Sequence, residues 1–374
     1  MTAMSRRTTV PMQRSGRERR TVLVTGATGV VGQALIPRLV DHGASDVICL
    51  THRSVMGARS GKRHAGSVST VQGDVARPDL GLGAREYRDL AARVDSVVHA
   101  AALTDFAGPD ETLHRVNVGG TEHALAMADA AGAQFVHVST AYLDARGEGQ
   151  RGHIAARYAA SKRAAEAVVK ASGVGHSIVR PSIVIGDSRT GVMASAQGLH
   201  RAAGAVLSGI APILPFGASW PFDFIPQDVV ADTVAGIVEH ERIGEELWVT
   251  AGRQALTLAQ AVDVVMATGR KLGIKVDTPR FVSPEQFDRI IGPVFLPALP
   301  ATMRNTITRL LDFFAVYLDM DEPMPSSLPA LEEQGVAVLP DLAESLRRSL
   351  HWYATQEQIR AARAVSMSRD EAVA

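Results

Sequence analysis

The fold is decided by the stretch Thr25-Gly26-Ala27-Thr28-Gly29-Val30-Val31-Gly32, which follows a short apolar run and opens a segment of helical periodicity. In such a loop Gly26 permits a tight turn, Gly29 lets the backbone approach a pyrophosphate, and Gly32 lets helix and strand pack closely. The N-terminus of the following helix offers free N–H groups and the positive end of its dipole to phosphates. We therefore predict a dinucleotide-binding loop. Its expected contacts with the cofactor are Gly26, Thr28, Gly29, Val30 and Val31.

Short apolar runs alternate with helical periods on both sides of this loop. The alternation predicts an α/β fold with a doubly wound parallel sheet of the Rossmann type, because strands covered on both faces are apolar throughout. The expected strands are Thr21–Thr25, Val47–Thr51, Ser67–Gln72, Ser96–Ala100, Gln134–Ser139 and His176–Arg180. The expected helices lie near 30–42, 84–93, 111–131 and 155–173.

The alternation weakens beyond Gly186, where several prolines interrupt the chain. Residues 245–251 indicate one more strand and 257–273 one more helix. We expect residues 21–186 and 225–255 to form the dinucleotide-binding domain. Residues 187–224 and 256–374 are then expected to form a smaller, mainly helical substrate-side region.

The composition is that of an ordinary globular protein, with 46% hydrophobic and 21% charged residues and a formal net charge of zero. This balance gives no reason to expect a nucleic-acid partner. Residues 1–20 hold six Arg and one acid and are expected to form a disordered basic tail. No apolar stretch of about 18 residues and no signal peptide are visible, so we expect no transmembrane segment and a cytoplasmic location.

The single cysteine, Cys49, excludes a disulfide framework and a cysteine-based metal site. It falls within an apolar run, where an inert buried thiol is expected. The twelve histidines lack the spacing of metal ligands, and we predict no metal site.

Cofactor selection is expected to depend on the end of the second strand, Thr51-His52-Arg53, which carries no acid for the ribose hydroxyls of NAD. Arg53 is expected to pair with the 2′-phosphate of NADP(H), the alternative being a solvated surface arginine. Asp74 and Val75 follow the third strand, where Asp74 is suited to accept from the adenine amino group. The small residues after the fourth strand leave room for the cofactor, and they are Ala100, Ala101 and Ala102.

A catalytic set is indicated by Tyr158 and Lys162, whose i, i+4 spacing puts phenol and ammonium on one helix face. The cation is expected to lower the tyrosine pKa toward working pH. Thr140, or Ser139 beside it, is expected to donate to a substrate oxygen. Asn117, within a predicted helix, is expected to hold a water behind Lys162.

Taken together, these motifs resemble the extended short-chain dehydrogenases/reductases over about residues 21–255. A finer resemblance, to the fatty acyl-CoA and carrier-protein thioester reductases (the male-sterility type), lies in Gly73-Asp74-Val75, Pro78–Leu82, His99–Ala102, Val138–Tyr142 and Arg180–Gly186. It implies NADP(H) as cofactor and Thr140, Tyr158 and Lys162 as catalytic residues. It also implies cofactor contacts from Pro181, Ser182 and Ile183.

The expected function is reduction of an acyl thioester, on coenzyme A or an acyl-carrier protein, to an aldehyde or alcohol. Two alternatives on the same scaffold stay open: a sugar-nucleotide epimerase and a hydroxysteroid-type dehydrogenase. A non-catalytic NADP-binding sensor is a third. The apolar stretches Ile290–Leu299 and Leu310–Leu318 are expected to be core, or else a lid or a peripheral membrane contact for a long acyl chain. The sequence also leaves the oligomeric state open, with a homodimer as one alternative.

Overall fold

The structure of the protein, a computed structural model, describes residues 20–52, 67–104, 109–143, 153–318 and 322–356. Arg53 and nearly all of the predicted basic tail lie outside the described residues.

A seven-stranded parallel sheet forms the centre of the molecule, in the order β11-β6-β5-β4-β1-β2-β3. Its strands are β1 (Thr21–Thr25), β2 (Asp46–Thr51), β3 (Ser67–Gln72), β4 (Ser96–His99), β5 (Gln134–Val138), β6 (His176–Pro181) and β11 (Glu246–Val249). The doubly wound parallel sheet is confirmed, and the first six strands agree with their predicted bounds to within one residue at each end.

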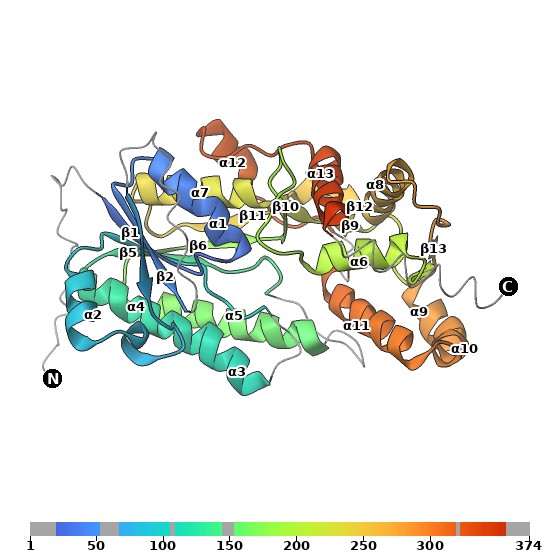
Figure 1. Cartoon of the computed structure of the whole chain (residues 1–374), viewed down its shortest axis with the longest axis horizontal. Helices are drawn as coiled ribbons and strands as arrows, with labels where there is room; N and C mark the ends of the chain where they lie inside the picture. Colours follow the sequence, from blue (N-terminus) through green and yellow to red (C-terminus); the bar gives the residue numbers. More distant parts are fainter. Residues whose placement is uncertain (1–19, 53–66, 105–108, 144–152, 319–321, 357–374) are drawn as a thin grey trace, which may run out of the picture.

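Helices cover both faces of this sheet. Helices α1 (Val30–Asp41) and α7 (Gln227–Glu239) pack together on one face. The other face is covered by α2 (Ala84–Ala91), α4 (Gly120–Ala131) and α5 (His153–Ala171) (Figure 1). Because both faces are covered, every residue of β1, β4 and β5 is buried, which explains their apolar character.

The helix predicted at 111–131 is broken into three pieces. A short helix, α3 (Asp110–His114), passes into a π-helical turn, η2 (Arg115–Gly119), before α4 begins. The hydrophobic pattern runs through all three, so periodicity alone predicts one helix. A π-helical turn inside a helix is frequent at functional sites, and this one carries Asn117.

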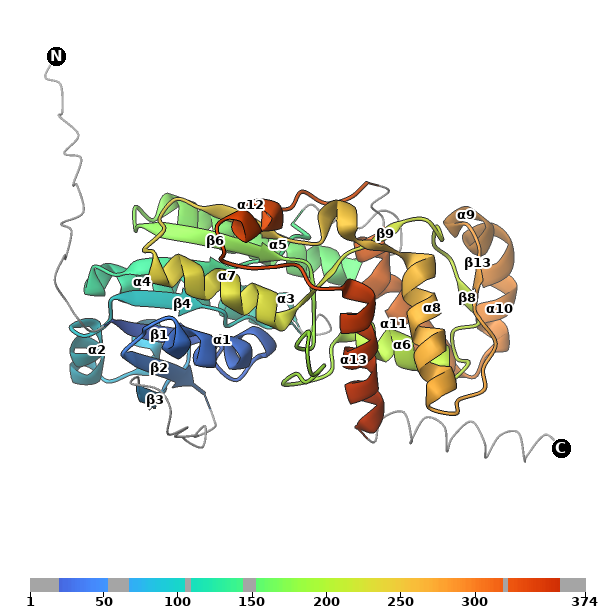
Figure 2. The same cartoon turned by 90° about the horizontal axis from the view of Figure 1, so that it is seen from above.

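The region that the sequence predicts to be on the substrate side lies beyond the carboxyl ends of the strands (Figures 1 and 2). Its helices are α6 (Gly198–Leu207), α8 (Leu258–Lys271), α9 (Pro284–Gln286), α10 (Gly292–Ala298), α11 (Ala301–Leu318) and α13 (Leu342–Thr355), with a second π-helical turn, η4 (Phe287–Ile291). Three two-stranded pairs accompany them: β7 (Ile183–Ile185) with β10 (Phe224–Pro226), β9 (Pro221–Phe222) with β12 (Leu256–Thr257), and β8 (Ile213–Leu214) with β13 (Arg280–Phe281).

The apolar stretch Ile290–Leu299 was expected to be core. Its side chains Ile290 and Val294 are 68% and 74% exposed, so for these two the expectation is wrong. The stretch forms the end of η4 and all of α10, which lie at the outer end of the region (Figure 2).

The chain returns to the central sheet after α11. Ser327 N donates to Trp248 O at 2.8 Å, and Trp248 N donates to Ser327 Oγ at 3.0 Å. Thr250 Oγ1 donates to Pro325 O at 2.5 Å. Residues 325–327 therefore bond to the carboxyl end of β11 at its outer edge before α12 (Leu328–Glu333) begins.

The last described helix, α13, is tied to the rest by Ser349. Its Oγ lies 2.8 Å from His200 Nε2 and accepts from Gly186 N at 3.0 Å. Gln197 N donates to His200 Nδ1 at 3.3 Å, so the imidazole proton is on Nε2, which donates to the serine. One buried histidine thus joins α6, α13 and the turn after β7.

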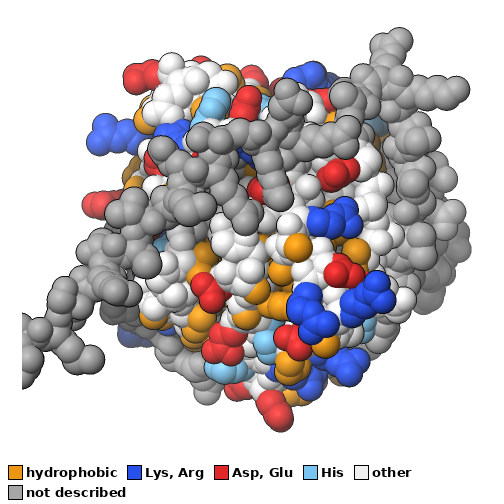
Figure 3. All heavy atoms as spheres, turned by 90° about the vertical axis from the view of Figure 1, so that its left-hand side faces the viewer, with side chains coloured by type: hydrophobic (Ala, Val, Ile, Leu, Met, Phe, Trp, Pro, Cys, Tyr) orange, Lys and Arg blue, Asp and Glu red, His pale blue; other side chains and the backbone are white. Residues whose placement is uncertain are grey.

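The end of the molecule opposite the substrate-side region carries Lys and Arg side chains interspersed with Asp and Glu (Figure 3). Within the described ranges, no helix is both long and apolar enough to cross a bilayer.

Candidate active site

The glycine loop joins β1 to α1 in a shape that larger residues do not permit. Gly26 has φ of +72°, and a Cβ there would lie 2.5 Å from the carbonyl carbon of Ala100. A Cβ on Gly32 would lie 2.2 Å from Gly26 O, so the helix packs directly on the turn. Gly29 is the exposed N-cap of α1, and no side chain caps the free N–H groups of the first turn of this helix. These donors fit a pyrophosphate, as the sequence predicts.

The strand ends around the loop bring together most of the other predicted cofactor contacts. Ala100 N donates to Thr25 O at 3.2 Å, and Ala101 N donates to Thr25 Oγ1 at 3.4 Å. Ala100, Ala101 and Ala102 therefore follow β4 directly beside the loop. The adenine and pyrophosphate of a dinucleotide fit this edge, where small side chains leave the backbone accessible.

Asp74 and Val75 are held at the end of β3 by a left-handed turn. Asp79 and Leu80 have φ of 53° and 57°, and Leu80 is fully buried. Leu80 O accepts from Asp74 N at 2.7 Å, which folds the segment back on itself. The motif from Gly73 to Leu82 therefore shapes this edge of the sheet. Within it, Asp74 Oδ1 accepts a hydrogen bond from Ala76 N at 2.9 Å.

The predicted catalytic residues come from β5 and α5. Lys162 is fully buried, and its Nζ donates to Val138 O, the last residue of β5, at 2.8 Å. Thr140 lies two residues further on, and its Oγ1 accepts from Tyr142 N at 3.3 Å. Tyr158 is half-buried one helical turn before Lys162. The end of β5 and the first half of α5 therefore bring the three predicted residues to one edge of the sheet.

Burial controls the titration of this set. It raises the pKa of Tyr158 to about 12 and lowers the pKa of Lys162 to about 8, the latter against the opposing charge of Glu166. The expected lowering of the Tyr158 pKa is therefore wrong for this structure. A phenol with this pKa is protonated at neutral pH, which is the form a proton donor needs.

Asn117 connects α5 to the segment after β4. Its Oδ1 accepts from Leu103 N at 2.7 Å, and its Nδ2 donates to Leu103 O at 3.2 Å and to Ser161 Oγ at 3.0 Å. Ser161 Oγ in turn donates to Tyr158 O at 2.7 Å. Asn117 thus fixes the turn of α5 that carries Tyr158. A water behind Lys162 stays a prediction.

Pro181, Ser182 and Ile183 lie next to the Thr140 segment. Ala141 N donates to Pro181 O at 2.8 Å, and Ser182 N donates to Val249 O at 3.1 Å. The side chains of Pro181 and Ser182 are buried and that of Ile183 is half-buried. The segment is therefore beside the catalytic edge, while its contacts with a cofactor stay a prediction.

Two buried histidines under this edge were given no role by the sequence reasoning. The rings of His99 and His137 stack with centroids 5.7 Å apart. His99 Nδ1 lies 2.8 Å from Thr25 Oγ1, and His137 Nε2 lies 3.4 Å from Lys162 Nζ. Burial, and then the charge of Lys162, lowers the pKa of both imidazoles, so both are neutral. The available signal was a histidine at or next to the end of two otherwise apolar strands.

A second missed cluster anchors α5 to the sheet. Arg180 donates to Glu166 through Nε at 2.8 Å and Nη2 at 2.6 Å, with both side chains almost completely buried. Arg180 Nη2 also reaches Glu246 on β11 at 2.6 Å, and the guanidinium lies 5.1 Å from the centre of the Trp248 ring. Since Glu166 is one turn after Lys162, this cluster fixes the helix that carries the lysine.

Cys49 is buried in β2, as expected, and burial raises the pKa of its thiol to about 11. The only cysteine of the chain is therefore unsuited to act as a nucleophile.

Comparison with known proteins identifies the family of the chain. The family model described as Male sterility protein, an NAD-binding domain, matches residues 24–234, more than half of the chain. This range contains the glycine loop and the four predicted catalytic residues Asn117, Thr140, Tyr158 and Lys162. The chain is also 32% identical, over 254 residues, to a linear gramicidin synthase of Brevibacillus parabrevis. That match covers 58% of this chain and 5% of that protein, so the chain spans a small part of its curated relative.

Solved structures resemble the chain over nearly its whole length. The terminal R domain of the myxalamid PKS-NRPS pathway matches with a TM-score of 0.69 and 25% identity, covering 92% of each chain. The reductase domain of a nonribosomal peptide synthetase from Mycobacterium tuberculosis matches with a TM-score of 0.64 and 21% identity, covering 92% of this chain and 93% of that one. The first likeness agrees with the resemblance read from the motifs, and the second shows the same fold.

Proposed function

This chain belongs to the male sterility family of NAD-binding extended short-chain dehydrogenases/reductases, and we propose that it reduces an acyl thioester with hydride from NADPH. The observation that carries the proposal is the arrangement of Thr140, Tyr158 and Lys162 at the carboxyl edge of a sheet with a dinucleotide loop. The substrate is an acyl group on coenzyme A or an acyl-carrier protein.

In the proposed reaction NADPH, held by the Gly26–Gly32 loop, would supply a hydride to the thioester carbonyl carbon. The hydroxyl of Thr140 and the phenol of Tyr158 donate to the carbonyl oxygen as negative charge develops on it, which is worth several kcal/mol in a dry site. Tyr158 then transfers its proton to that oxygen, forming a hemithioacetal. Collapse of the hemithioacetal breaks the carbon–sulfur bond and releases a thiol and an aldehyde. A second NADPH would supply the hydride that reduces the aldehyde, and Tyr158 would again donate the proton to its oxygen, giving an alcohol.

Lys162 supplies a positive charge to the proposed catalytic set. Its ammonium is buried beside the end of β5 and is positioned to stabilise the phenolate that Tyr158 becomes after proton transfer. Asn117, through Ser161, keeps the same helix turn in place.

No covalent enzyme intermediate is needed in this scheme. A mechanism that passes through a covalent thioester on an enzyme cysteine requires a reactive thiolate. Cys49 is instead buried in β2, and burial raises the pKa of its thiol. This supports direct addition of hydride to the substrate.

The preference for NADPH is supported by the end of β2. Thr51 and His52 precede Arg53, and no acid is present there to bind the ribose hydroxyls of NAD. The proposed cofactor contacts are Gly26, Thr28, Gly29, Val30, Val31, Arg53, Asp74, Val75, Ala100, Ala101, Ala102, Tyr158, Lys162, Pro181, Ser182 and Ile183. Residues 21–186 and 225–255 are proposed to hold the cofactor, and 187–224 and 256–374 the substrate.

The experiment is incubation of the purified chain with NADPH and a panel of acyl-CoAs, acyl-carrier proteins, ketones and UDP-sugars. Loss of reduced-nicotinamide absorbance is followed while free thiol is counted in parallel. One thiol released for each one or two NADPH consumed is expected for thioesters. Turnover of a ketone or a UDP-sugar with no thiol from any thioester would contradict the proposal.

A further inference from the structure

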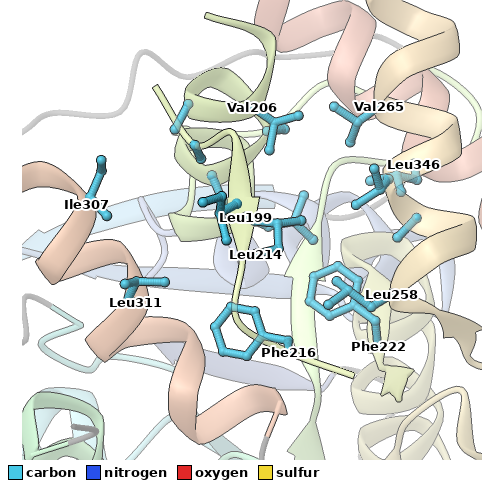
Figure 4. A pocket seen from close by; sticks show the side chains of 17 residues that line it. Leu199, Val206, Leu214, Phe216, Phe222, Leu258, Val265, Ile307, Leu311 and Leu346 are labelled. Atoms are coloured by element: carbon cyan, nitrogen blue, oxygen red, sulfur yellow. The ribbon is translucent and has the colours of Figure 1, made fainter. Parts of the chain in front are cut away.

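An apolar pocket lies in the substrate-side region, between α6, α8, α11 and α13 and the short strands β8 and β9 (Figure 4). The space between its walls is about 780 Å³, open solvent at the mouth included, so the pocket is a groove that is open on one side. All 17 lining residues found in the described part of the chain are Ala, Val, Leu, Ile or Phe. A polar ligand placed there would lose its hydrogen bonds to water without replacing them.

One end of the pocket is linked to the catalytic edge. Phe222 lines the pocket, and the carbonyl oxygen of the next residue, Asp223, accepts from Tyr142 Oη at 2.9 Å. Tyr142 N in turn donates to Thr140 Oγ1 at 3.3 Å. Tyr142 therefore contacts both the residue that follows the pocket wall, through its side chain, and a proposed catalytic hydroxyl, through its backbone.

Helix α11 makes a second link. It contributes Ile307 and Leu311 to the pocket wall and contacts α5, the helix that carries Tyr158. Two independent contacts thus relate the pocket to the catalytic edge.

At the other end of the pocket α6 and α8 converge. A Cβ on Gly269 of α8 would lie 2.4 Å from the Leu207 side chain of α6, so the helices meet closely there. Val206 precedes Leu207, and Val265 lies one turn before Gly269. Their side chains lie at the end of the pocket away from Phe222 (Figure 4).

We propose that this pocket binds the alkyl tail of the acyl group, with Phe222 at the end nearer the thioester and Val206 and Val265 as the stop that sets chain length. The inference rests on the proposed thioester reductase function. The occupant has to tolerate entirely apolar walls and to reach the catalytic edge. An alkyl chain does both, because it needs no polar partner and extends from the reacting carbonyl. Coenzyme A, a nucleotide sugar and a peptide all carry polar groups that these walls do not satisfy.

The test measures tail binding without turnover. The full chain is titrated with dansyl-labelled undecanoic acid, and saturated fatty acids of increasing length then displace it. Affinity is expected to rise about fourfold per methylene, equivalent to about 0.8 kcal/mol, until the pocket is full. No probe binding, or displacement independent of chain length, would overturn the proposal without any variant.

Val265→Phe and Val206→Phe extend the test by filling the end of the pocket away from Phe222, from two different helices. Each is expected to weaken binding of the longest chains at least tenfold and leave the shortest unchanged. Val338→Phe is the matched control, because Val338 is 57% exposed and outside the pocket. If both pocket variants keep the wild-type length series, the chain-length stop is refuted.

The same variants separate the two proposals. Length-dependent tail binding that Val265→Phe shortens, with no thioester turned over, supports the pocket and refutes the reductase function. Turnover of acyl-CoAs at rates independent of chain length, in wild type and variants alike, supports the reductase and refutes the pocket.

Discussion

Lys162 Nζ lies 3.4 Å from Nε2 of His137, a neutral imidazole in the core of the sheet. A neutral imidazole nitrogen accepts a hydrogen bond, so His137 is positioned to favour the ammonium form of a lysine that burial disfavours. The pair therefore ties the charge of the proposed catalytic lysine to a residue outside the catalytic set.

A pH dependence follows from this pair. Burial lowers the pKa of Lys162 to about 8, so the lysine loses its charge as the pH rises through that value. We expect kcat/KM to fall above pH 8, about tenfold per pH unit. His137→Leu removes the acceptor and should move this limb to lower pH, whereas His137→Gln retains an acceptor and should move it less. A profile flat to pH 10 in the wild type would contradict the role of Lys162.

Tyr158→Phe should lower turnover by about two orders of magnitude or more, because it removes the proton donor and keeps the ring. Cofactor binding, measured by fluorescence titration, should change little. Tyr87→Phe on α2 is the control for loss of a tyrosine hydroxyl outside the site. Near-normal turnover by Tyr158→Phe would mean that another group protonates the product.

Gly26→Ala and Gly43→Ala compare two glycines with positive φ, +72° and +85°. An added Cβ at Gly43 meets nothing within 4 Å, so only backbone strain of about 1 kcal/mol is expected. At Gly26 the Cβ collides with the backbone at Ala100. We expect Gly26→Ala alone to lose dinucleotide binding, measured by calorimetry. Equal affinity in the two variants would show that the turn is not part of the site.

The buried pair Arg180–Glu166 gives a stability prediction. Arg180→Met leaves Glu166 buried without its bidentate partner and should lower the free energy of unfolding by about 3–5 kcal/mol. Glu166→Gln in the same chain removes the stranded charge and should recover part of this loss. Urea unfolding of both single variants and the double variant measures the coupling. Additive losses would mean that the two side chains do not interact.

Arg53→Ala should reduce the preference for NADPH, which we expect to be at least tenfold over NADH, or about 1.4 kcal/mol. The guanidinium is proposed to pair with the 2′-phosphate that only NADPH carries. Arg85→Ala, an exposed arginine on α2, is the control for a general loss of positive charge. Equal binding of the two cofactors by the wild type would remove the basis of this prediction.

The sheet and the glycine loop could be predicted because both depend on local patterns. An apolar strand buried on both faces, such as β1, has few alternatives, and the spacing of Gly26, Gly29 and Gly32 reports one backbone shape. The same holds for Tyr158 and Lys162, whose spacing fixes a shared helix face.

Features that depend on long-range contacts could not be predicted. His99 and His137 become neighbours only because β4 and β5 pair in register. Whether the pKa of Tyr158 is raised or lowered depends on burial of its side chain, which the helix pattern does not report. Likewise, the apolar pocket combines residues from four separate helices, and no single one of their periodic patterns indicates a cavity.

The pairing of residues 325–327 with β11 also sets an order of events during biosynthesis. Trp248 and Ser327 are 79 residues apart. At about 5–20 residues per second, the ribosome needs roughly 4–16 s to add that stretch, and until then Trp248 lacks its two backbone hydrogen bonds with Ser327. An uncovered strand edge recruits other strands, so this interval is when a nascent chain is exposed to self-association and to chaperones. Ribosomes that stop before codon 325 would release a protein whose sheet stays open at that edge.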